Sequence, residues 1–256
     1  MIQNTKFIII STVYNKGKWI SYNINSVYQQ SYQNYIAIYG YDKSTDNTLN
    51  YINNTFDLIN DDRFHIYHNT DSGSFLKCFM NTYSYLKDKG LVNSEDVIVE
   101  IDGDDWLLHP FVLQHLSDIY ANENIWMTYG QYICYPNGDY GGHIYLHLDD
   151  VVDKTNSYRT STFPYSHLKT YKAHLLDRVN KEDLIDITTN DYFTAAGDFA
   201  LCMPMVEMAG KSRIHRVDVP LYVYNVGIEN SETNSRLTEQ KSAEYRIRKL
   251  KPRNRI

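Results

Sequence analysis

Three carboxylates stand within four positions of the chain, at Asp102, Asp104 and Asp105, with only Gly103 between them. Residues 97–101, just before them, are mostly β-branched and apolar, which is typical of a buried strand. Carboxylates this close raise one another's pKa unless a positive charge lies between them. A divalent cation is the simplest such partner, because hard cations bind carboxylate oxygens and often bridge to a substrate phosphate. One interpretation of this stretch is therefore a metal site at these carboxylates.

A simpler interpretation of the same residues is an acidic turn. Asp is favoured at the N-cap of a helix and Pro in its first turn, so the carboxylates would cap a helix that begins near Pro110. Gly103 fits the metal hypothesis, since a residue without Cβ lets backbone and ligand approach closely. On this stretch alone both interpretations stay open.

Strands and helices alternate along the first half of the chain. Apolar periodicity predicts strands over residues 6–12, 35–41, 64–68 and 97–101, and each strand is followed by a helical pattern. This alternation predicts an α/β fold with a mostly parallel sheet covered by helices on both faces. Ligands bind such sheets beyond the carboxyl ends of the strands. Polar clusters at residues 12–16, 42–46 and 102–105 follow three of these strands, so we expect them to form one cleft.

The second half of the chain has a weaker pattern. Glycines and prolines in residues 136–170 predict loops or an irregular lobe. We expect a helix over 171–179, an apolar helix over 199–209 that Pro204 kinks or begins, and short strands over 214–217 and 221–224. No repeat or linker divides the chain, so we expect one domain. Its parts are a donor-binding half (1–135), an acceptor-binding half (136–237) and a basic helix or tail (238–256).

Composition excludes several classes of protein. A chain of 256 residues with 43% hydrophobic residues can bury a core, and its net charge of −6 argues against a nucleic-acid binder. Three widely spaced cysteines favour a reducing compartment, and no apolar run is long enough for a signal peptide or a membrane span. We therefore expect a soluble cytoplasmic protein. The basic tail is either a solvated helix or a weak contact to an anionic membrane surface.

Several short motifs, in order, resemble family 2 glycosyltransferases, which have the GT-A fold. Residues 11–16 (STVYNK), 25–32 (NSVYQQSY) and 42–48 (DKSTDNT) resemble the opening of that family. Residues 101–106 (IDGDDW) resemble its metal-binding Asp-x-Asp element. Residues 126–130 (WMTYG) and 197–201 (GDFAL) resemble later blocks. The resemblance runs from about residue 7 to residue 224.

This resemblance implies an inverting, metal-dependent hexosyltransferase-type enzyme. It would move a sugar from a nucleotide-diphosphate donor, with a UDP-sugar favoured, to a hydroxyl of a glycan, protein or lipid-linked acceptor. By resemblance, Asp102 contacts the ribose and Asp104 the metal, Mn²⁺ or Mg²⁺, with Gly103 between them. The cation would neutralise the charge that grows on the departing nucleoside diphosphate.

The resemblance also assigns the remaining donor contacts. Thr12 and Tyr14 flank the base, and Asp42 accepts a hydrogen bond from its edge. Lys77 and Lys16 are candidates for the diphosphate. Each has a simpler alternative: a turn aromatic for Tyr14, a helix cap for Asp42, and solvated side chains for the lysines.

On the acceptor side, Asp198 is the candidate general base, with Asp191 as its rival. A carboxylate suits this role when the site tunes its pKa, but Asp198 could equally be the N-cap of the following helix. Asp105, Trp106 and His167 are further acceptor-side candidates; their alternatives are a helix cap, core packing and a structural histidine. The histidine that some relatives carry after residue 224 is absent here, so Asn225, Glu229 or a water would replace it.

Two other functions compete with this one. Sugar-1-phosphate nucleotidyltransferases share the nucleotide-binding sheet and the metal, but they usually carry a glycine-rich loop after the first strand, where this chain has only Gly17. A non-catalytic module that binds a nucleotide or a glycan would be expected to lose Asp102, Asp104 or Asp198. All three are present.

Overall fold

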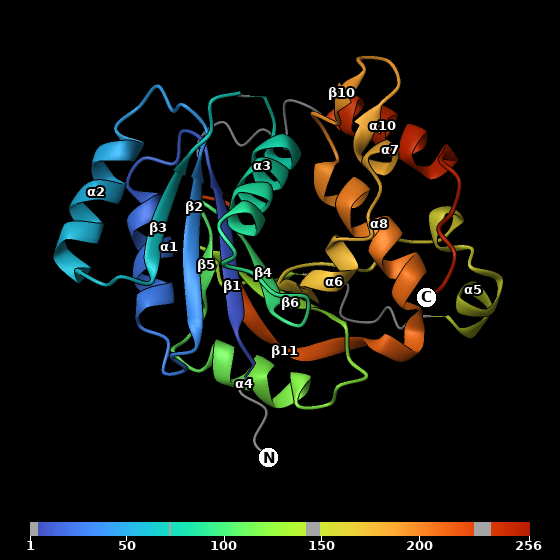
Figure 1. Ribbon diagram of the computed structural model, residues 1–256, viewed down its shortest axis with the longest axis horizontal. Coiled ribbons are helices and arrows are strands. Elements are labelled where there is room, and N and C mark those ends of the chain that lie inside the picture. Colours follow the sequence, from blue (N-terminus) through green and yellow to red (C-terminus); the bar gives the residue numbers. More distant parts are fainter. Residues whose placement is uncertain (1–4, 72, 142–148, 228–236) are drawn as a thin grey trace.

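The computed structural model describes residues 5–71, 73–141, 149–227 and 237–256. Within them, nine strands form one sheet in the order β3-β2-β1-β4-β8-β6-β11-β5, with β7 paired to β6 (Figure 1). The strands are β1 Phe7–Val13, β2 Tyr35–Tyr41, β3 Phe64–His68, β4 Val97–Asp102, β5 Trp106–Leu107, β6 Met127–Tyr135, β7 Tyr140–Gly141, β8 Lys169–Lys172 and β11 Ile214–Asn225. A separate two-stranded sheet pairs β9 Ile185–Asp186 with β10 Asp191–Tyr192.

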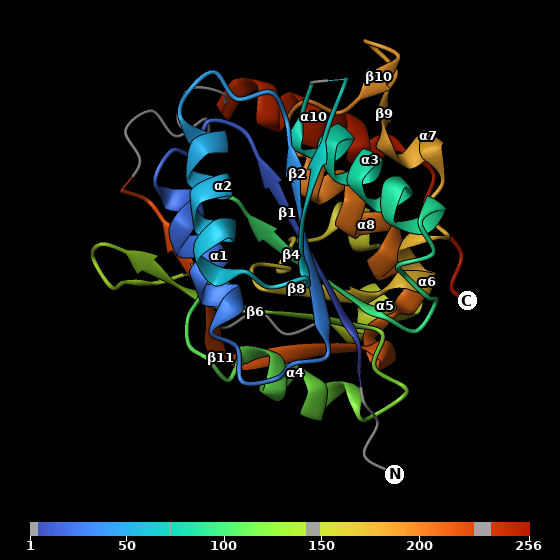
Figure 2. The same ribbon diagram turned by 60° about the vertical axis from the view of Figure 1, so that its left-hand side comes forward.

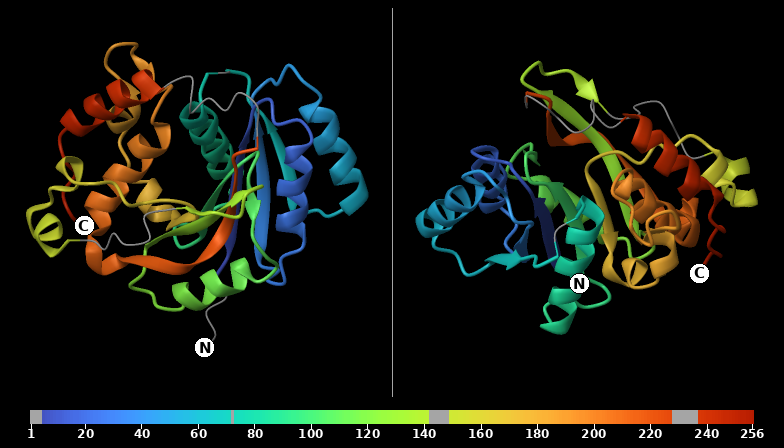
Figure 3. Two further views of the ribbon diagram at one scale, coloured as in Figure 1. Left: turned by 180° about the vertical axis from the view of Figure 1, so that it is seen from behind. Right: turned by 90° about the horizontal axis from the view of Figure 1, so that it is seen from above.

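Helices cover both faces of the large sheet. Helices α1 and α2 lie on one side, and α3 lies on the other, where α8 packs against α3 and α10 against α8 (Figures 1 and 3). The helices are α1 Trp19–Tyr28, α2 Thr48–Ile59, α3 Phe75–Asp88, α4 Val112–Tyr120, α5 Asp150–Thr155, α6 Ala173–Leu176, α7 Lys181–Leu184, α8 Gly197–Ala209 and α10 Leu237–Lys249, with 3₁₀ turns η1 Tyr158–Thr160 and η2 Lys211–Arg213.

Strand β1 runs through the centre of the fold and is buried along its whole length. Its side chains alternate between the two faces, as a strand requires. Phe7 and Ile9 belong to the core under α1, whereas Ile8 and Ile10 belong to the core under α3. β1 pairs in parallel with both β2 and β4, and β6 pairs in parallel with β11. The predicted α/β fold with a mostly parallel, doubly covered sheet is confirmed.

The prediction of a helix over residues 171–179 was wrong. Residues 169–172 form strand β8, which lies antiparallel to both β4 and β6, and only Ala173–Leu176 is helical. Tyr171 is buried between Ile98 and Met127 of the neighbouring strands. The apolar spacing of this segment fits a helix, but strand partners on both sides override such local preferences.

Two other elements differ from their predictions in extent. The two short strands expected over 214–224 are one strand, β11, whose register with β6 is irregular around Pro220. Pro204 lies inside α8 rather than in its first turn. Residues 199–209 of this helix are buried on all sides, so tertiary packing holds the helix together across the proline.

The basic tail is a helix followed by an extended segment, and much of its charge is neutralised within the chain. Arg246 pairs with Asp186, Arg248 with Glu244, Arg253 with Asp183, and Arg255 with Asp153. Ala243 and Ile247 of α10 are buried. The tail is therefore docked on the rest of the protein, not simply solvated (Figure 2). None of the described helices is long and apolar enough to cross a bilayer, and the three cysteines are free thiols.

A buried arginine ties this tail to α8. Arg159 is 2% exposed and forms a bidentate salt bridge with Glu207. The Nε–Oε1 distance is 2.7 Å and the Nη2–Oε2 distance is 3.0 Å. Arg159 also donates to the carbonyl of Ile247, and the backbone amide of Arg253 donates to Glu207. The pair therefore holds η1, α8, α10 and the C-terminal segment together.

Removing one partner of this pair should destabilise the fold strongly. Arg159→Met leaves the carboxylate of Glu207 buried without its partner, which costs about 3–5 kcal/mol of unfolding free energy. Lys211→Met, which removes an exposed pair with Asp150, should cost much less, because water and salt screen exposed charges. Urea unfolding measures both. Arg159→Met combined with Glu207→Met should cost less than Arg159→Met alone, and a larger cost would contradict the charge argument.

Candidate active site

The carboxyl ends of β1, β2 and β4 meet at one edge of the sheet. Thr12 lies beside Gly40 of β2 on one side and beside Asp102 of β4 on the other. Asp42 follows β2 directly, and its backbone amide donates to the carbonyl of Val13. The three predicted polar clusters therefore lie together, and the acidic turn lies beside the carboxyl ends of β1 and β2.

Gly103 is required by the packing of the chain itself. A Cβ atom on Gly103 would lie 2.8 Å from the carbonyl oxygen of Thr12, closer than real Cβ contacts come, and 3.2 Å from Cγ of Lys16. The amide of Gly103 also donates to that carbonyl at 3.2 Å. A side chain here would push the acidic turn away from the end of β1.

The three carboxylates of the turn have different surroundings. Asp102 and Asp104 are partly exposed, and Asp104 Oδ2 lies 2.8 Å from Nζ of Lys16. Asp105 is 2% exposed, and its Oδ1 accepts from the backbone amide of Asn225 at 2.8 Å. Asp105 thus anchors the end of β11 inside the protein. The sequence analysis expected Asp105 to face an acceptor or to cap the next helix, and its buried position fits neither role.

Crowding perturbs the protonation of this turn. Burial, and then the charges of Asp104 and Glu100, raise the pKa of Asp102 to about 7. Burial and the charge of Asp102 raise the pKa of Asp105. Burial alone would lower the pKa of Lys16, but Asp104 raises it above its ordinary value. Even with Lys16 in place, these carboxyl groups hold their protons more tightly than ordinary aspartates do, because too little positive charge lies near them.

A divalent cation fits this shortage of positive charge. In the part of the chain that the structure describes, no three His, Cys, Asp or Glu side chains are grouped as a complete metal site. Asp102 and Asp104 would supply two carboxylates. Mg²⁺ and related ions commonly bind through one or two carboxylates and take their remaining ligands from water and substrate phosphates. Asn225 donates its side-chain amide to the carbonyl of Asp104, and Glu229 lies outside the described residues.

Asn23 of α1 holds the acidic turn from behind, and the sequence analysis missed it. Its Nδ2 donates to the carbonyl of Asp102 at 2.9 Å and to that of Asp105 at 2.8 Å. The side chain is fully buried on the same helix face as Ile20 and Ile24. An asparagine within an apolar helix face was the available signal, because a buried amide requires hydrogen-bond partners.

The residues predicted to contact the base lie at this edge. Thr12 is buried, and Tyr14 is 44% exposed. Asp42 is buried and accepts from Nδ2 of Asn69 at 3.0 Å and from the amide of Gly73 at 3.4 Å. It therefore orders the segment after β3. The helix-cap alternative for Asp42 was wrong, because Asn47 occupies the N-cap position of α2.

Lys77 and Asp191 are paired with each other. Nζ of Lys77 lies 3.0 Å from Asp191 and 2.8 Å from Asp71, so the lysine is not simply solvated. The hydrogen bonds that Lys77 donates to these two carboxylates raise the pKa of Lys77, and Lys77 lowers that of Asp191. The lysine expected at the diphosphate and the rival base thus form one bridge between the start of α3 and β10.

Asp198 lies in the first turn of α8, and its side chain is 49% exposed. Ala196 occupies the N-cap position, so the N-cap alternative for Asp198 was wrong. Nζ of Lys169 lies 3.5 Å from Asp198 Oδ2 and 3.2 Å from Glu100 Oε1. Burial opposes ionisation of Asp198, but the charge of Lys169 lowers its pKa below the ordinary value. Asp198 is therefore an ionised carboxylate at neutral pH.

His167 and Trp106 are both packed among aromatic rings. The ring of His167 stacks on Tyr222 with centroids 4.8 Å apart, and burial lowers the pKa of His167 to about 3. This neutral histidine fits the structural alternative. Trp106 lies in a cluster with three aromatic neighbours, Trp19, Tyr22 and Tyr135. Tyr22 is 53% exposed and Tyr135 is 41% exposed, so the cluster reaches the surface.

Comparison with known families decides the class of protein. The family model described as Glycosyl transferase family 2 matches residues 8–201. The chain belongs to this family. The edge of the sheet described above is therefore the candidate active site of a family 2 chain, and its fold is the GT-A fold.

Solved structures resemble this family 2 chain at low identity. The S. aureus TarS 1–349 complex with UDP-GlcNAc has a TM-score of 0.65 and 17% identity, over 90% of this chain and 61% of that one. The Pyrobaculum calidifontis mannosyltransferase PcManGT, in complex with GDP-Man and Mn²⁺, has a TM-score of 0.63 and 16% identity, over 94% and 64%. Glucosyl-3-phosphoglycerate synthase from Mycobacterium tuberculosis, with Mn²⁺, UDP and glucosyl-3-phosphoglycerate, has a TM-score of 0.57 and 15% identity, over 95% and 80%. The chain thus spans less than two thirds of TarS 1–349, and no curated protein matches it.

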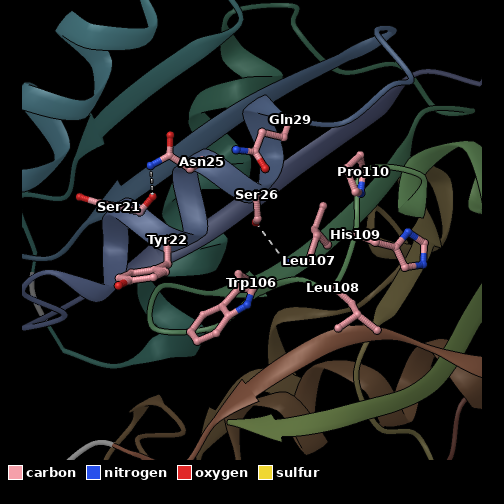
Figure 4. A pocket seen from close by; sticks show the side chains of 10 residues that line it. All are labelled: Ser21, Tyr22, Asn25, Ser26, Gln29, Trp106, Leu107, Leu108, His109 and Pro110. Carbon is pink, nitrogen blue, oxygen red and sulfur yellow. Dashed lines mark hydrogen bonds between the residues drawn. The ribbon is translucent and has the colours of Figure 1, made fainter. Parts of the chain in front are cut away.

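A groove runs along α1 beside the acidic turn (Figure 4). It has a volume of about 330 Å³ and lies between α1 and residues 106–110. No side chain that lines it is an Asp, Glu, Lys or Arg; the lining residues are Ser21, Tyr22, Asn25, Ser26, Gln29, Trp106, Leu107, Leu108, His109 and Pro110. Trp106 is thus shared between the end of the acidic turn and a groove that is lined by no Asp, Glu, Lys or Arg side chain.

The tight contact at Gly103 makes a testable prediction. Gly103→Ala should lower the free energy of unfolding by about 1–3 kcal/mol, because the new Cβ overlaps the backbone of Thr12. Gly130→Ala is the matched control, since its Cβ would meet its neighbours at the ordinary distance of 3.4 Å and beyond. Chemical denaturation of both variants measures the difference. Equal stability of the two variants would contradict the proposed close approach.

Proposed function

We propose that this family 2 chain is a metal-dependent, inverting glycosyltransferase that moves a sugar from a nucleotide-diphosphate donor to an acceptor hydroxyl. One observation carries this proposal. The acidic turn and Asp198 are joined through β4, since Glu100 pairs with the lysine that contacts Asp198 and stands two residues before Asp102. The proposed leaving-group site and the candidate base are thus close to the same edge of one sheet, which supports the proposal.

The donor would lie across the ends of β1, β2 and β4. Thr12 and Tyr14 would contact the base and Asp42 its edge. Asp102 and Asp104 would hold Mn²⁺ or Mg²⁺, and a bound cation supplies Lewis-acid stabilisation of the departing diphosphate. Lys16, beside Asp104, is placed to contact the diphosphate. Two of the similar structures contain UDP or UDP-GlcNAc and one contains GDP-Man, which supports a UDP-sugar as the favoured donor.

Asp198 would act on the acceptor. As the acceptor oxygen attacks the anomeric carbon, its proton passes to the carboxylate of Asp198, and the bond from that carbon to the diphosphate oxygen breaks. A single displacement inverts the configuration and needs no nucleophile from the enzyme. Both Asp198 and Asp191 are partly exposed and paired with a lysine. Asp198 is the better candidate because its lysine also contacts Glu100, two residues before Asp102, whereas Asp191 is paired with Lys77 at the start of α3.

The aromatic cluster around Trp106 supports a saccharide acceptor. Aromatic side chains offer apolar faces together with polar groups, and the adjoining groove adds amides and hydroxyls and has no Asp, Glu, Lys or Arg in its lining. This lining suits a neutral, hydroxyl-rich ligand.

Donor binding can be tested by thermal shift. UDP-, GDP- and other nucleotide-sugars should raise the melting temperature in the presence of Mn²⁺, because a ligand at 100 times its Kd adds about 2.7 kcal/mol to the folded state. Asp104→Ala should abolish the Mn²⁺-dependent part of this shift. The control Asp118→Ala, on the exposed face of α4, should keep it. If Asp104→Ala keeps the full Mn²⁺-dependent rise in melting temperature, Asp104 does not bind the metal.

The assignment of the base can be tested by kinetics with the donor found in that screen. Asp198→Asn should keep the donor affinity and lower kcat by about 10²–10⁴, because an amide cannot accept the proton. If Asp191 is the base instead, the loss of kcat should occur in Asp191→Asn and not in Asp198→Asn. Transfer by Asp198→Asn at the wild-type rate would place the base elsewhere.

A further inference from the structure

A lysine without an assigned role lies between the donor edge and the candidate base. Lys169 of β8 is directly opposite Glu100 of β4 in the antiparallel pairing, and both side chains are buried, at 2% and 4% exposure. Side chains at opposite positions of paired strands share one face and interact. The same ammonium group reaches Asp198 of α8, so it contacts two carboxylates from two different elements.

The surroundings hold this lysine rigidly. Tyr171, two residues further along β8, donates its hydroxyl to Oε2 of Glu100 at 3.3 Å, while Oε1 faces Lys169 at 3.2 Å. Both oxygens of Glu100 are thereby occupied. A buried ammonium group is tolerated only with such partners, because the loss of its hydration must be offset. Lys169 therefore has little freedom to move away from Asp198.

We infer that Lys169, held by Glu100, is a positioning residue that fixes the carboxylate of Asp198 in its ionised form with one oxygen turned toward the protein and the other left for the acceptor. The inference deepens the proposed function and rests on it where turnover is concerned. Its geometric part, the contact of a buried cation with a half-exposed carboxylate, stands on the distances alone.

The other groups around Asp198 do not replace this cation. Among the described residues, the titratable groups that face Asp198 are Lys169, His167, Glu100 and Cys202. His167 is neutral at physiological pH, since burial lowers its pKa to about 3, and burial raises the pKa of the Cys202 thiol. Glu100 is itself acidic. Lys169 is therefore the cation near Asp198 at neutral pH, and its own pKa is raised by Glu100 and Asp198 in spite of burial.

As a consequence, Asp198 stays unprotonated, and can act as a base, down to a lower pH than an unpaired aspartate. An opposite charge within about 4–6 Å typically lowers the pKa of an Asp by about 1–3 units. With Lys169 present, Asp198 stays ionised as the pH falls, so the acidic limb of kcat/KM lies at low pH. Without Lys169, the carboxyl group takes up its proton at a higher pH and the limb moves upward.

The chain offers a matched control three residues away. Lys172 lies in the same strand, is also buried at 5% exposure, and pairs with Glu95 at 3.0 Å, away from Asp198. Lys172→Met and Lys169→Met each remove one largely buried ammonium group from β8. Only the second touches the candidate base.

The test compares these variants by two measurements. The first is ¹³C NMR titration of the Asp198 carboxyl group, assigned by its loss in Asp198→Asn; the second is the pH profile of kcat/KM. Lys169→Met should raise the pKa of Asp198 and the acidic limb together by about 1–3 units, Lys169→Arg should restore both, and Lys172→Met should leave both unchanged. Glu100→Gln keeps an oxygen that can face Lys169 but removes a negative charge near Asp198, so it should lower both values, and this decrease decides the matter if Lys169→Met fails to fold.

The two measurements separate the two hypotheses. The inference is overturned if the NMR pKa of the Asp198 carboxyl group is the same in wild type, Lys169→Met and Lys172→Met. It is also overturned if this pKa rises in Glu100→Gln. Absence of transfer by the wild type with every nucleotide-sugar overturns the proposed function, and the NMR titration still decides the role of Lys169. A shift of the limb that Lys169→Arg does not restore would assign Lys169 to packing and not to charge.

Discussion

The accumulation of negative charge at the end of β4 is the constraint on which the rest of the site depends. Glu100, Asp102, Asp104 and Asp105 follow one another within six residues, and burial raises the pKa of the first two and of Asp105. Like charges in a poorly solvated place are tolerated only with positive partners. The fold supplies them from both flanks: Lys16 from the turn after β1, and a lysine of β8 opposite Glu100.

The acidic turn is also held mechanically by three contacts from different elements. Asn23 of α1 binds the carbonyls at both ends of the turn, and Asn225 at the end of β11 binds Asp105 and the carbonyl of Asp104. Gly103 allows the turn to lie against the backbone of Thr12. Carboxylates that must hold a cation need such fixed placement, because a loose turn would let them move apart. The buried Asp105 thus contributes structure, while Asp102 and Asp104 remain available.

The second half of the chain is attached to the edge of the sheet that carries the acidic turn by strand pairing, a shared apolar core and buried charge. Strand β8 inserts between β4 and β6, and its lysine reaches α8, whose far end is fixed by Glu207 and Arg159. One buried helix therefore has a carboxylate of the candidate site at its start and a structural ion pair near its end. This arrangement explains how a helix with a proline inside it can present Asp198 in a defined position.

The sequence by itself determined the class of fold, the order of the first four strands and helices, and the convergence of Thr12, Asp42 and Asp102, because apolar periodicity and the parallel topology place the strand ends at one edge. The resemblance to family 2 also drew attention to Asp198, whose role stays a prediction. The sequence could not place Lys169, because the four residues of β8 look locally like part of a helix. Their pairing with β4 depends on residues about 70 positions away in the chain. The tertiary structure alone decided that Asp105 faces inward, that Lys77 is bound to Asp191, and that the basic tail is neutralised, because ion pairs between distant elements depend on packing and leave no periodic trace in the sequence.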